Sequence, residues 1–346
     1  MAPDLTVAAV MPVRNGADRL ERAIASVLDQ THPVHELLIA VGLSDDDTHG
    51  LATAAAARDQ RISVVANPTG RTPNGLNLAI AASTADVIVR VDAGSVLPTD
   101  YVERALITLA STGAANVGAI QHSVGSTPFE RAVAAAVTSK FGVGNATYRY
   151  GDGSPRPVDT AYLGVFRRSA LKAVGGYDEH FTRNQDYELN WRLRHIDNGV
   201  WLDPALRVVY RPRSSLRALA RQYWEYGWWR AETVRKHPTS LKPRQLAAPL
   251  LLLGLSLSGF AALRGRRRGA LAVPSIYAGA VAFTAAAANP EISLAERKRL
   301  LLIFPTVHLS WACGLISSAS RIATSAIVDA LLRVTNDTDP TGAPTG

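Results

Sequence analysis

A carboxylate near the middle of the chain has the setting that proton-transfer chemistry requires. Asp186 lies in the segment FTRNQDYELNWRL, residues 181–193, where a predicted helix begins. A carboxylate that is held in place and ionised at neutral pH can take a proton from an attacking hydroxyl group. The segment also permits a structural interpretation, because Thr182 and Gln185 have the spacing of a capping box, and an acidic residue in the first turn offsets the helix dipole. The segment alone leaves both interpretations open.

Most polar residues in the first third of the chain stand in loops that follow predicted strands. Short apolar runs predict strands at residues 7–11, 37–41, 62–66, 87–91 and 117–121. The residue pattern between them predicts helices at 17–30, 45–58, 76–82 and 99–111. This alternation predicts an α/β fold with a mostly parallel sheet covered by helices on both faces. Ligands of such sheets bind beyond the carboxyl ends of the strands, where the loops PVRNG, GLSDDDT, NPTGRTPNG and DAGS lie.

The region from 128 to 213 mixes extended and helical patterns. We expect an extended segment at 158–166, a helix at 168–174 that Gly175-Gly176 ends, the Asp186 helix at 185–195 and a strand at 206–210. A helix rich in tryptophan and arginine follows at 215–238. It could pack on the domain, but its place before the first apolar stretch favours a position at a membrane interface.

Three apolar stretches follow at 246–263, 270–288 and 300–319. Each has about the length that crosses a bilayer core, roughly 20 residues, so we expect membrane helices rather than buried hairpin helices. If the N-terminal part is cytoplasmic and all three stretches span, the loop RGRRRG at 264–269 lies outside, against the positive-inside tendency. Either the first two stretches form a shallow re-entrant pair or the tendency does not hold here.

These patterns divide the chain into four parts. We expect a domain at 1–213, an interfacial helix region at 214–244, a membrane region at 245–333 and a disordered tail at 334–346. Hydrophobic residues make up 47% of the 346 residues and the formal net charge is +8. No nucleic-acid-binding motif accompanies this charge, so we expect a membrane surface rather than nucleic acid as the partner.

Other sequence features exclude further classes of protein. The single cysteine, Cys313, excludes a disulfide within the chain. The first residues lack a basic segment followed by an apolar run, so we expect no signal peptide. No G-x-G-x-x-G follows the first predicted strand and no P-loop motif occurs, which argues against dinucleotide-dependent oxidoreductases and P-loop phosphotransferases.

Six sequence blocks occur in a fixed order between residues 7 and 238. They read MPVRNGADRLERAIASVLDQT, SDDDT, NPTGRTPNGLNLAIAAS, VIVRVDAGSVLPTDYV, GVFRRSALKAVGGYDEHFTRNQDYELNWRLR and RQYWEYGWWRAETVRKHP. In this order, with apolar segments after them, they resemble glycosyltransferase family 2, and more narrowly its membrane-bound members of succinoglycan-type exopolysaccharide synthesis. The resemblance implies a GT-A fold, a Rossmann-like mixed sheet with helices on both faces, followed by transmembrane helices. It also implies a nucleotide-sugar donor, a divalent metal (Mg²⁺ or Mn²⁺) and inversion at the anomeric carbon.

The resemblance assigns roles to particular residues. Asp186 matches the base that deprotonates the acceptor hydroxyl while the nucleoside diphosphate leaves from the opposite face, and nearby Arg183 is expected to keep it ionised. The expected donor-binding residues are Pro12, Arg14, Asn15, Arg71, Asp92, Arg221 and Gln222. On the acceptor side we expect Asp178, Glu179 and Gln185. Arg71 and Arg221 could equally be surface or interface arginines, and Asn15 with Gly16 favours a polar turn by itself.

Two departures from the family pattern fall on the donor side. Where relatives carry aspartates directly after the second strand, this chain has Val41 and Gly42, and its acidic run at 45–47 comes later, where it could instead cap a helix. The D-x-D motif that binds metal reads Asp92-Ala93-Gly94, so Asp92 alone remains as a metal ligand. A processive-synthase Q-x-x-R-W signature is absent, which favours transfer of a single sugar per event.

Two hypotheses follow. The first is a membrane-anchored inverting glycosyltransferase, with its catalytic domain on the cytoplasmic side of a multi-pass protein of the cell membrane. It would move a sugar, expected to come from a UDP-sugar, to a lipid-linked or membrane-proximal glycan acceptor. The second is a weakly active or inactive partner subunit with the same fold, within a membrane assembly of other glycan-building proteins. The altered positions Val41, Gly42 and Gly94 motivate the second hypothesis.

Overall fold

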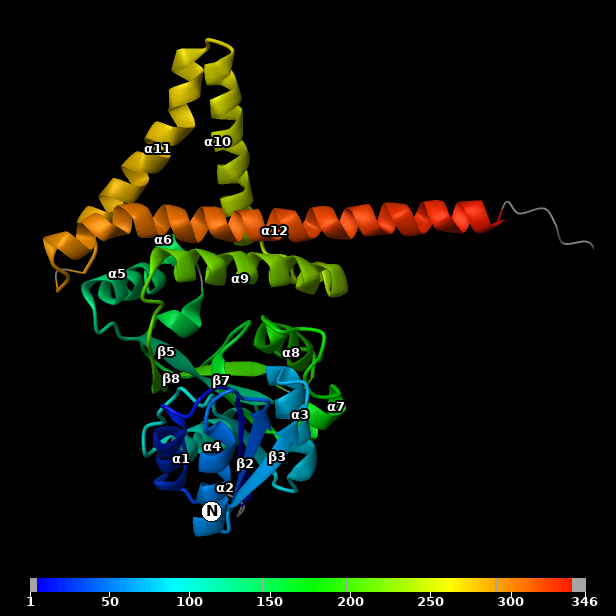
Figure 1. The fold of residues 1–346 in the computed structure, drawn as a ribbon. Coiled ribbons are helices and arrows are strands. Elements are labelled where there is room, and N and C mark those ends of the chain that lie inside the picture. The colour runs from blue at the N-terminus through cyan, green and yellow to red at the C-terminus, as the bar shows by residue number, and fades with distance from the viewer. Residues whose placement is uncertain (1–4, 145, 197, 290, 338–346) are drawn as a thin grey trace, which may run out of the picture. The chain divides into compact units, whose positions relative to one another are not determined.

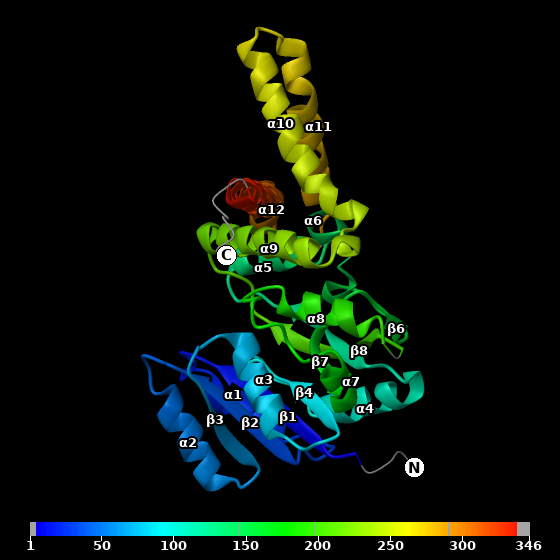
Figure 2. The same cartoon turned by 90° about the vertical axis from the view of Figure 1, so that its right-hand side faces the viewer.

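The chain forms two compact units in the computed structural model, which describes residues 5–144, 146–196, 198–289 and 291–337. The first unit comprises Met1–Ser214 and Ala288–Leu300, and the second comprises Ser215–Ala287 and Leu301–Gly346. Figures 1 and 2 show the ribbon from two directions.

An eight-stranded mixed sheet forms the centre of the first unit, in the order β3-β2-β1-β4-β7-β5-β8-β6. Strands β1 to β4 run parallel, as does the pair β5 and β8. Strand β7 is antiparallel to β4 and β5, and β6 is antiparallel to β8. The strands are β1 Val7–Val13, β2 Glu36–Gly42, β3 Ile62–Asn67, β4 Val87–Arg90, β5 Asn116–Ser123, β6 Arg156–Pro157, β7 Tyr162–Arg167 and β8 Val200–Tyr210.

Helices cover both faces of this sheet because successive residues of its buried strands point to opposite sides. Val7, Ala9 and Met11 of β1 pack with α1 (Leu20–Leu28), α2 (Thr48–Arg58) and α4 (Tyr101–Thr112). Ala8 and Val10 of the same strand pack with α3 (Thr72–Ala82), α7 (Arg168–Ala173) and α8 (Gln185–Leu193). The predicted α/β architecture with helices on both faces is therefore confirmed.

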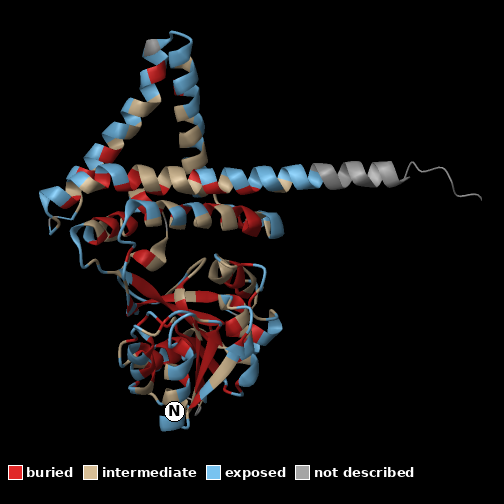
Figure 3. Ribbon diagram, in the orientation of Figure 1, coloured by how far each residue is buried: buried red, intermediate tan, exposed pale blue. Residues whose placement is uncertain are grey.

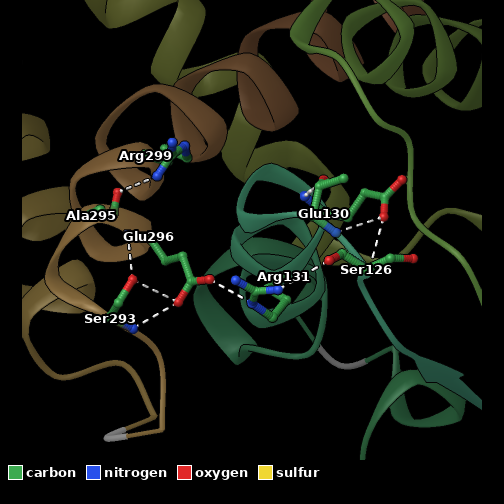
Figure 4. Close-up of polar contacts among 8 residues, drawn as sticks. Ser126, Glu130, Arg131, Ser293, Ala295, Glu296 and Arg299 are labelled. Atoms are coloured by element: carbon green, nitrogen blue, oxygen red, sulfur yellow. Dashed lines mark hydrogen bonds and ion pairs between the residues drawn. The ribbon is translucent and has the colours of Figure 1, made fainter.

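The first unit also contains the segment that connects the last two helices of the chain. Its remaining short elements are α5 (Pro128–Val137), α6 (Lys140–Val143) and the 3-10 turn Thr147–Arg149. Glu296, which is 3% exposed, accepts a hydrogen bond from Arg131 Nε of α5 at 2.6 Å. Figure 4 shows this ion pair together with the hydrogen bonds that Glu296 accepts from Ser293. The chain thus rejoins the first unit between its last two helices.

The second unit consists of helices. They are α9 (Leu216–Lys236), the 3-10 turns Pro238–Ser240 and Pro243–Leu246, α10 (Ala247–Leu263), α11 (Arg267–Ala286) and α12 (Leu294–Asp337), whose first turns lie in the first unit. Three segments, Pro243–Leu263, Arg268–Ala286 and Leu294–Ala326, are long and apolar enough to cross a membrane. Most residues of these segments are not buried (Figure 3), which is the pattern of helices that face lipid.

The backbones of α9 and α12 approach each other closely within the second unit. A Cβ atom added to Gly227 of α9 would collide with the Trp311 carbonyl of α12, and one added to Gly314 would collide with the Trp224 carbonyl. Arg321 of α12 donates to the buried carboxylate of Glu232 in α9. Small residues at the crossing point therefore permit close helix packing, as in many membrane-helix pairs.

The predicted elements are present, with shifted ends. Predicted helix 17–30 is shorter, and the second strand of the later region begins at Val200 rather than at residue 206. Gly175 and Gly176 end α7 with positive φ angles of 75° and 71°, as the sequence predicts. Helix α12 continues to Asp337, so it includes the first residues of the predicted tail 334–346, and residues 338–346 lie outside the described residues.

Candidate active site

The carboxyl ends of the parallel strands β1, β2 and β4 meet at one edge of the sheet. Arg90 is the last residue of β4, and Asp92 follows it in the loop DAGS. Parallel sheets bind ligands at this edge because the loops there are free to carry polar side chains. The site described below is built from these loops and from the first turn of α8.

A buried arginine connects the two carboxylates that the sequence singles out. The Arg90 side chain is 5% exposed, whereas those of Asp92 and Asp186 are 38% and 36% exposed. Arg90 donates from Nη2 and Nε to Asp92 Oδ1 at 3.0 and 3.1 Å, and from Nη1 to Asp186 Oδ1. One cation therefore fixes the expected donor-side carboxylate and the expected base at once. A buried charge of this kind is stable only when it is paired, as it is here.

One tyrosine ring lies against this arginine, and a second tyrosine lies near enough for the charge of Arg90 to act on it. The Tyr177 ring lies 5.9 Å from the Arg90 guanidinium carbon, and the Tyr162 hydroxyl lies 3.5 Å from Ser95 Oγ. Burial raises the pKa of both tyrosines, so both phenols are neutral at physiological pH. Burial alone would lower the pKa of Arg90, but the charge of Asp92 and the hydrogen bonds it accepts raise that pKa above its usual value. The cation is therefore permanent.

Asp186 stands in the first turn of α8, which begins at Gln185. The preceding residue, Asn184, has a left-handed backbone conformation with φ of 63°, and its side chain makes no cap hydrogen bond. The capping-box interpretation of Thr182 and Gln185 is therefore wrong, because the helix begins two residues later than that motif requires. The turn at Asn184 directs the helix start, and Asp186 with it, toward the end of β4.

The acidic run after β2 holds the first loop in place. The Asn15 side chain accepts a hydrogen bond from Asp45 N at 2.9 Å and donates to Asp45 Oδ2 at 3.2 Å, while Ser44 Oγ accepts from Asn15 N at 3.1 Å. Asp46 accepts from Ala17 N at 3.0 Å, and its hydrogen bonds, that from the Thr48 hydroxyl first, lower its pKa. Asn15 and the acidic run at 45–47 thus stabilise the structure of these loops. Helix α2 begins at Thr48, so Asp47 of the acidic run is the residue at the cap position, but its side chain makes no cap hydrogen bond.

At Gly42 there is no room for the aspartate that relatives carry there. A Cβ atom at Gly42 would lie 2.9 Å from Gly70 Cα, closer than real Cβ atoms approach. The Arg14 side chain runs over both glycines, since the added Cβ atoms would lie 3.4 Å from Arg14 Cβ at Gly42 and 3.4 Å from Arg14 Cδ at Gly70. An exposed arginine therefore covers the place of the missing carboxylate.

An arginine side chain also lies beside the glycine of the incomplete D-x-D motif. A Cβ atom at Gly94 would lie 3.4 Å from Arg19 Cδ and 3.7 Å from Arg19 Nε. Arg19 is exposed and immediately precedes α1, and it donates to Asn15 O and Asp18 Oδ1, both at 2.8 Å. The guanidinium thus lies beside the position from which relatives project a metal ligand.

The side chains present do not fit a metal site of the D-x-D type. Asp92 supplies one carboxylate, and Arg90 already occupies its Oδ1 atom. Among the residues that the structure describes, no group of three His, Cys, Asp or Glu side chains is arranged to hold a metal ion. Divalent cations of this kind prefer several oxygen ligands and avoid neighbouring arginines.

The remaining predicted residues fall into three places. Pro12 lies within β1, paired with Ala40, and Arg71 is exposed just before α3. The Glu179 carboxylate accepts hydrogen bonds from Asn74 and Asn77 of α3. Asp178 Oδ1 accepts from His180 N at 2.9 Å, and Gln185 is the first residue of α8. Arg221 and Gln222 belong to α9 in the second unit, where Gln222 donates to the Tyr226 hydroxyl at 3.0 Å.

Two arginines of this site, Arg90 and Arg19, were not predicted from the sequence. Arg90 interrupts an otherwise apolar strand, VIVR, two residues before Asp92, and a charge in a buried strand is a signal that can be read without a structure. Arg19 carries no comparable signal, because its proximity to Gly94 depends on how α1 packs beside β4.

Sheet, helices and site together define a GT-A glycosyltransferase fold, the class that uses nucleotide-sugar donors. The sequence profile of Glycosyl transferase family 2 matches residues 8–175. The chain is 32% identical to the succinoglycan biosynthesis protein ExoA of Rhizobium meliloti over 314 residues, which cover 88% of this chain and 92% of that protein. The chain therefore belongs to glycosyltransferase family 2 and is a glycosyltransferase.

More distant similarities agree with this fold. The chain is 26% identical to the pre-mycofactocin glycosyltransferase of Mycobacterium tuberculosis over 267 residues, but it spans only 53% of that protein. The mannosyltransferase PcManGT of Pyrobaculum calidifontis, solved with GDP-Man and Mn²⁺, superimposes with a TM-score of 0.62 at 18% identity, over 91% of this chain and 87% of the other. S. aureus TarS 1–349 gives a TM-score of 0.50 at 12% identity, over 90% of this chain and 91% of the other.

Proposed function

We propose that this chain is a membrane-anchored inverting glycosyltransferase that moves a sugar from a nucleotide-sugar to a lipid-linked or membrane-proximal glycan acceptor. The observation that carries the proposal is the pairing of Asp92 and Asp186 through buried Arg90. It brings the carboxylate expected at the donor and the carboxylate expected at the acceptor to one cation. A UDP-sugar is the donor class we expect, and the catalytic unit would lie on the cytoplasmic side of the cell membrane.

The transfer is a single displacement at the anomeric carbon. The acceptor oxygen forms the new bond to this carbon, the bond to the diphosphate oxygen breaks, and the diphosphate leaves with the bonding electron pair. Asp186 takes the acceptor proton. Its Oδ1 atom is engaged by Arg90, so we assign the proton to Oδ2. Arg90 keeps the carboxylate oriented and favours its ionised form, because a neighbouring positive charge stabilises a negative one.

The family implies a divalent cation, Mg²⁺ or Mn²⁺, whose chemistry would be to neutralise the leaving diphosphate. The three long apolar helices support anchoring in a membrane. The relationship to ExoA supports a role in polysaccharide synthesis.

The experiment uses the full chain in lipid nanodiscs with UDP-, GDP- and dTDP-sugars and a membrane lipid extract as acceptor source. We expect sugar transfer with one donor class, and a loss of about 10³-fold or more in Asp186→Asn. The matched control is Asp152→Asn, because Asp152 is an exposed aspartate paired only with Arg207 among the ion pairs of the first unit that the structure describes. Turnover that survives in Asp186→Asn would refute the assignment of the base, and the absence of binding of every donor would refute the transferase proposal.

The second candidate is a partner subunit of low activity. Gly42 has no room for a side chain and Gly94 carries none, so the carboxylates that the family pattern has at these two positions are missing, which favours this candidate. Donor binding without turnover in the presence of the lipid extract would support this candidate over the first.

A further inference from the structure

Both donor-side positions that lack a carboxylate are covered by an arginine. Arg14 runs over Gly42 and Gly70, and Arg19 lies beside Gly94. The two arginines come from the same β1–α1 loop region, and both are exposed at the edge where β1, β2 and β4 end. At both places an arginine side chain lies beside a glycine where the family pattern has a carboxylate.

Three arginines present positive charge at this edge, and of the aspartates that the same loops carry, Asp45 and Asp46 accept hydrogen bonds from the β1–α1 loop itself. Asp92 and Asp186 share the charge of Arg90, which leaves one net negative charge among the three groups. Arg14, Arg19 and exposed Arg71 add three positive charges from neighbouring loops. The only carboxylate that contacts Arg19 among the described ion pairs is Asp18, whose side chain is 77% exposed. An exposed pair of this kind contributes little, so a ligand would compete mainly with the hydrogen bond that Arg19 donates to Asn15 O at 2.8 Å.

We propose that Arg19 binds the diphosphate of the nucleotide-sugar directly, with Arg14 adding a second positive charge, so that donor binding does not depend on a protein-held metal ion. The inference rests on the proposed function and names how its donor is held. A guanidinium presents two parallel N–H groups that match two phosphate oxygens. Asp92 stands alone and is already bonded to Arg90, so it is poorly suited to hold a cation that would bind the diphosphate instead. Arg19 would fill the place of the metal at the motif that lacks its second aspartate.

The test is calorimetric binding of UDP and GDP to the full chain, with either Mn²⁺ or EDTA present. For the unaltered chain we expect dissociation constants in the two conditions that agree within about threefold. Arg19→Ala should weaken binding by about tenfold or more in both conditions. Arg22→Ala is the matched control, because Arg22 is an exposed arginine in the first turn of α1, three residues after Arg19, and this variant should bind as the unaltered chain does.

A second variant tests whether an aspartate at position 94 makes nucleotide binding depend on a metal ion. Gly94→Asp restores the family motif, and its Cβ atom would be in ordinary contact with Arg19 at 3.4 Å. In the double variant Arg19→Ala, Gly94→Asp we expect binding that Mn²⁺ strengthens by about tenfold or more. Binding by the unaltered chain that EDTA abolishes, together with an Arg19→Ala variant that binds normally, would overturn the inference. If neither nucleotide binds in any condition, the proposed function itself fails.

Discussion

Arg90 at the end of β4 forms an ion pair with Asp186 in the first turn of α8, although the two residues are 96 positions apart. The same guanidinium bonds Asp92 at 3.0 Å. The position of the expected base is therefore set by the residue that also holds the donor-side carboxylate. We regard Arg90 as a positioning residue, since it would act on the reaction through Asp186.

Replacement of Arg90 should reveal this role. Arg90→Lys keeps the charge but cannot bond both carboxylates with a planar fork, so we expect kcat to fall by about 100-fold. The acid limb of the pH profile of kcat/KM should move to higher pH in Arg90→Met, because the removal of a neighbouring cation disfavours the ionised carboxylate. The measurement is transfer rate against pH, with Arg22→Lys as control. An unchanged rate in Arg90→Lys, together with an unchanged pH profile in Arg90→Met, would contradict a positioning role.

Most of the fold could be predicted from the sequence because periodicity reports it directly. The apolar runs at Val7–Val13 and Glu36–Gly42 are buried strands, and the glycines after Ala173 end α7 as expected. The start of α8 was harder, because the capping-box spacing at Thr182 competes with the left-handed turn at Asn184, and the turn prevails. Local patterns do not show which of two possible starts the tertiary structure selects.

The site could be predicted only where a motif marks it. Asp92 and Asp186 stand in recognisable blocks, and the structure brings them to one arginine. Arg19 could not be predicted, since nothing in its own segment indicates contact with Gly94. Asn15 lies in the predicted donor-binding loop, but its side chain forms hydrogen bonds with Asp45. A role in holding the loop together therefore explains this residue without a contact to the donor.

Glu130 should make the first unit sensitive to acid. Its side chain is 1% exposed and accepts hydrogen bonds from Ser126 N, Thr127 N and Arg211 Nε at 2.8, 3.1 and 3.0 Å. Burial alone would raise the pKa of Glu130, but these bonds and the charge of Arg211 lower it below its usual value. A lowered pKa in the folded state means that this stabilisation is present above the unfolded pKa, about 4.3, and is lost as the pH falls through the folded pKa.

The check is the thermal midpoint of the unaltered chain and Glu130→Gln at several pH values. At pH 7 we expect the variant to be less stable by about 2 kcal/mol, because charged hydrogen bonds become neutral ones. The difference should shrink as the pH falls below about 4. Glu21→Gln, at an exposed position on α1, is the control and should show no such trend. A stability difference that stays constant down to pH 3 would contradict the assignment.

The connection between α11 and α12 predicts the membrane topology. Ala288–Leu300 belongs to the first unit, where Glu296 pairs with Arg131. For helices in a membrane, we expect the chain to return to the side of the first unit after α11, with α10 and α11 together crossing twice or not at all. The apolar segments Pro243–Leu263 and Arg268–Ala286, of 21 and 19 residues, are long enough to favour two crossings, which would place the arginine-rich loop around Arg266 on the far side.

Labelling of single cysteines tests this topology in a Cys313→Ser background. A membrane-impermeant maleimide should reach Glu291→Cys and Asp152→Cys from the same side, because both positions are exposed in the first unit. We expect Arg266→Cys to be labelled from the opposite side. Labelling of all three from one side would instead indicate a re-entrant pair. Labelling of Glu291→Cys and Asp152→Cys from opposite sides would refute the return of the chain.

The close crossing of α9 and α12 should depend on its two glycines. At Gly227 and Gly314 an added Cβ atom would collide with the backbone of the opposite helix, so neither position can accept alanine without separating the helices. We expect Gly314→Ala to destabilise the detergent-solubilised chain by about 1–3 kcal/mol, as overpacked interiors do, and to weaken the ion pair of Arg321 with Glu232. Gly259→Ala on α10 is the matched control, because an added Cβ atom there meets nothing within 4 Å. In the control the better helix propensity of alanine should leave stability unchanged or raise it, by up to about 1 kcal/mol. Equal thermal midpoints for Gly314→Ala and Gly259→Ala would show that the two helices do not pack through this crossing.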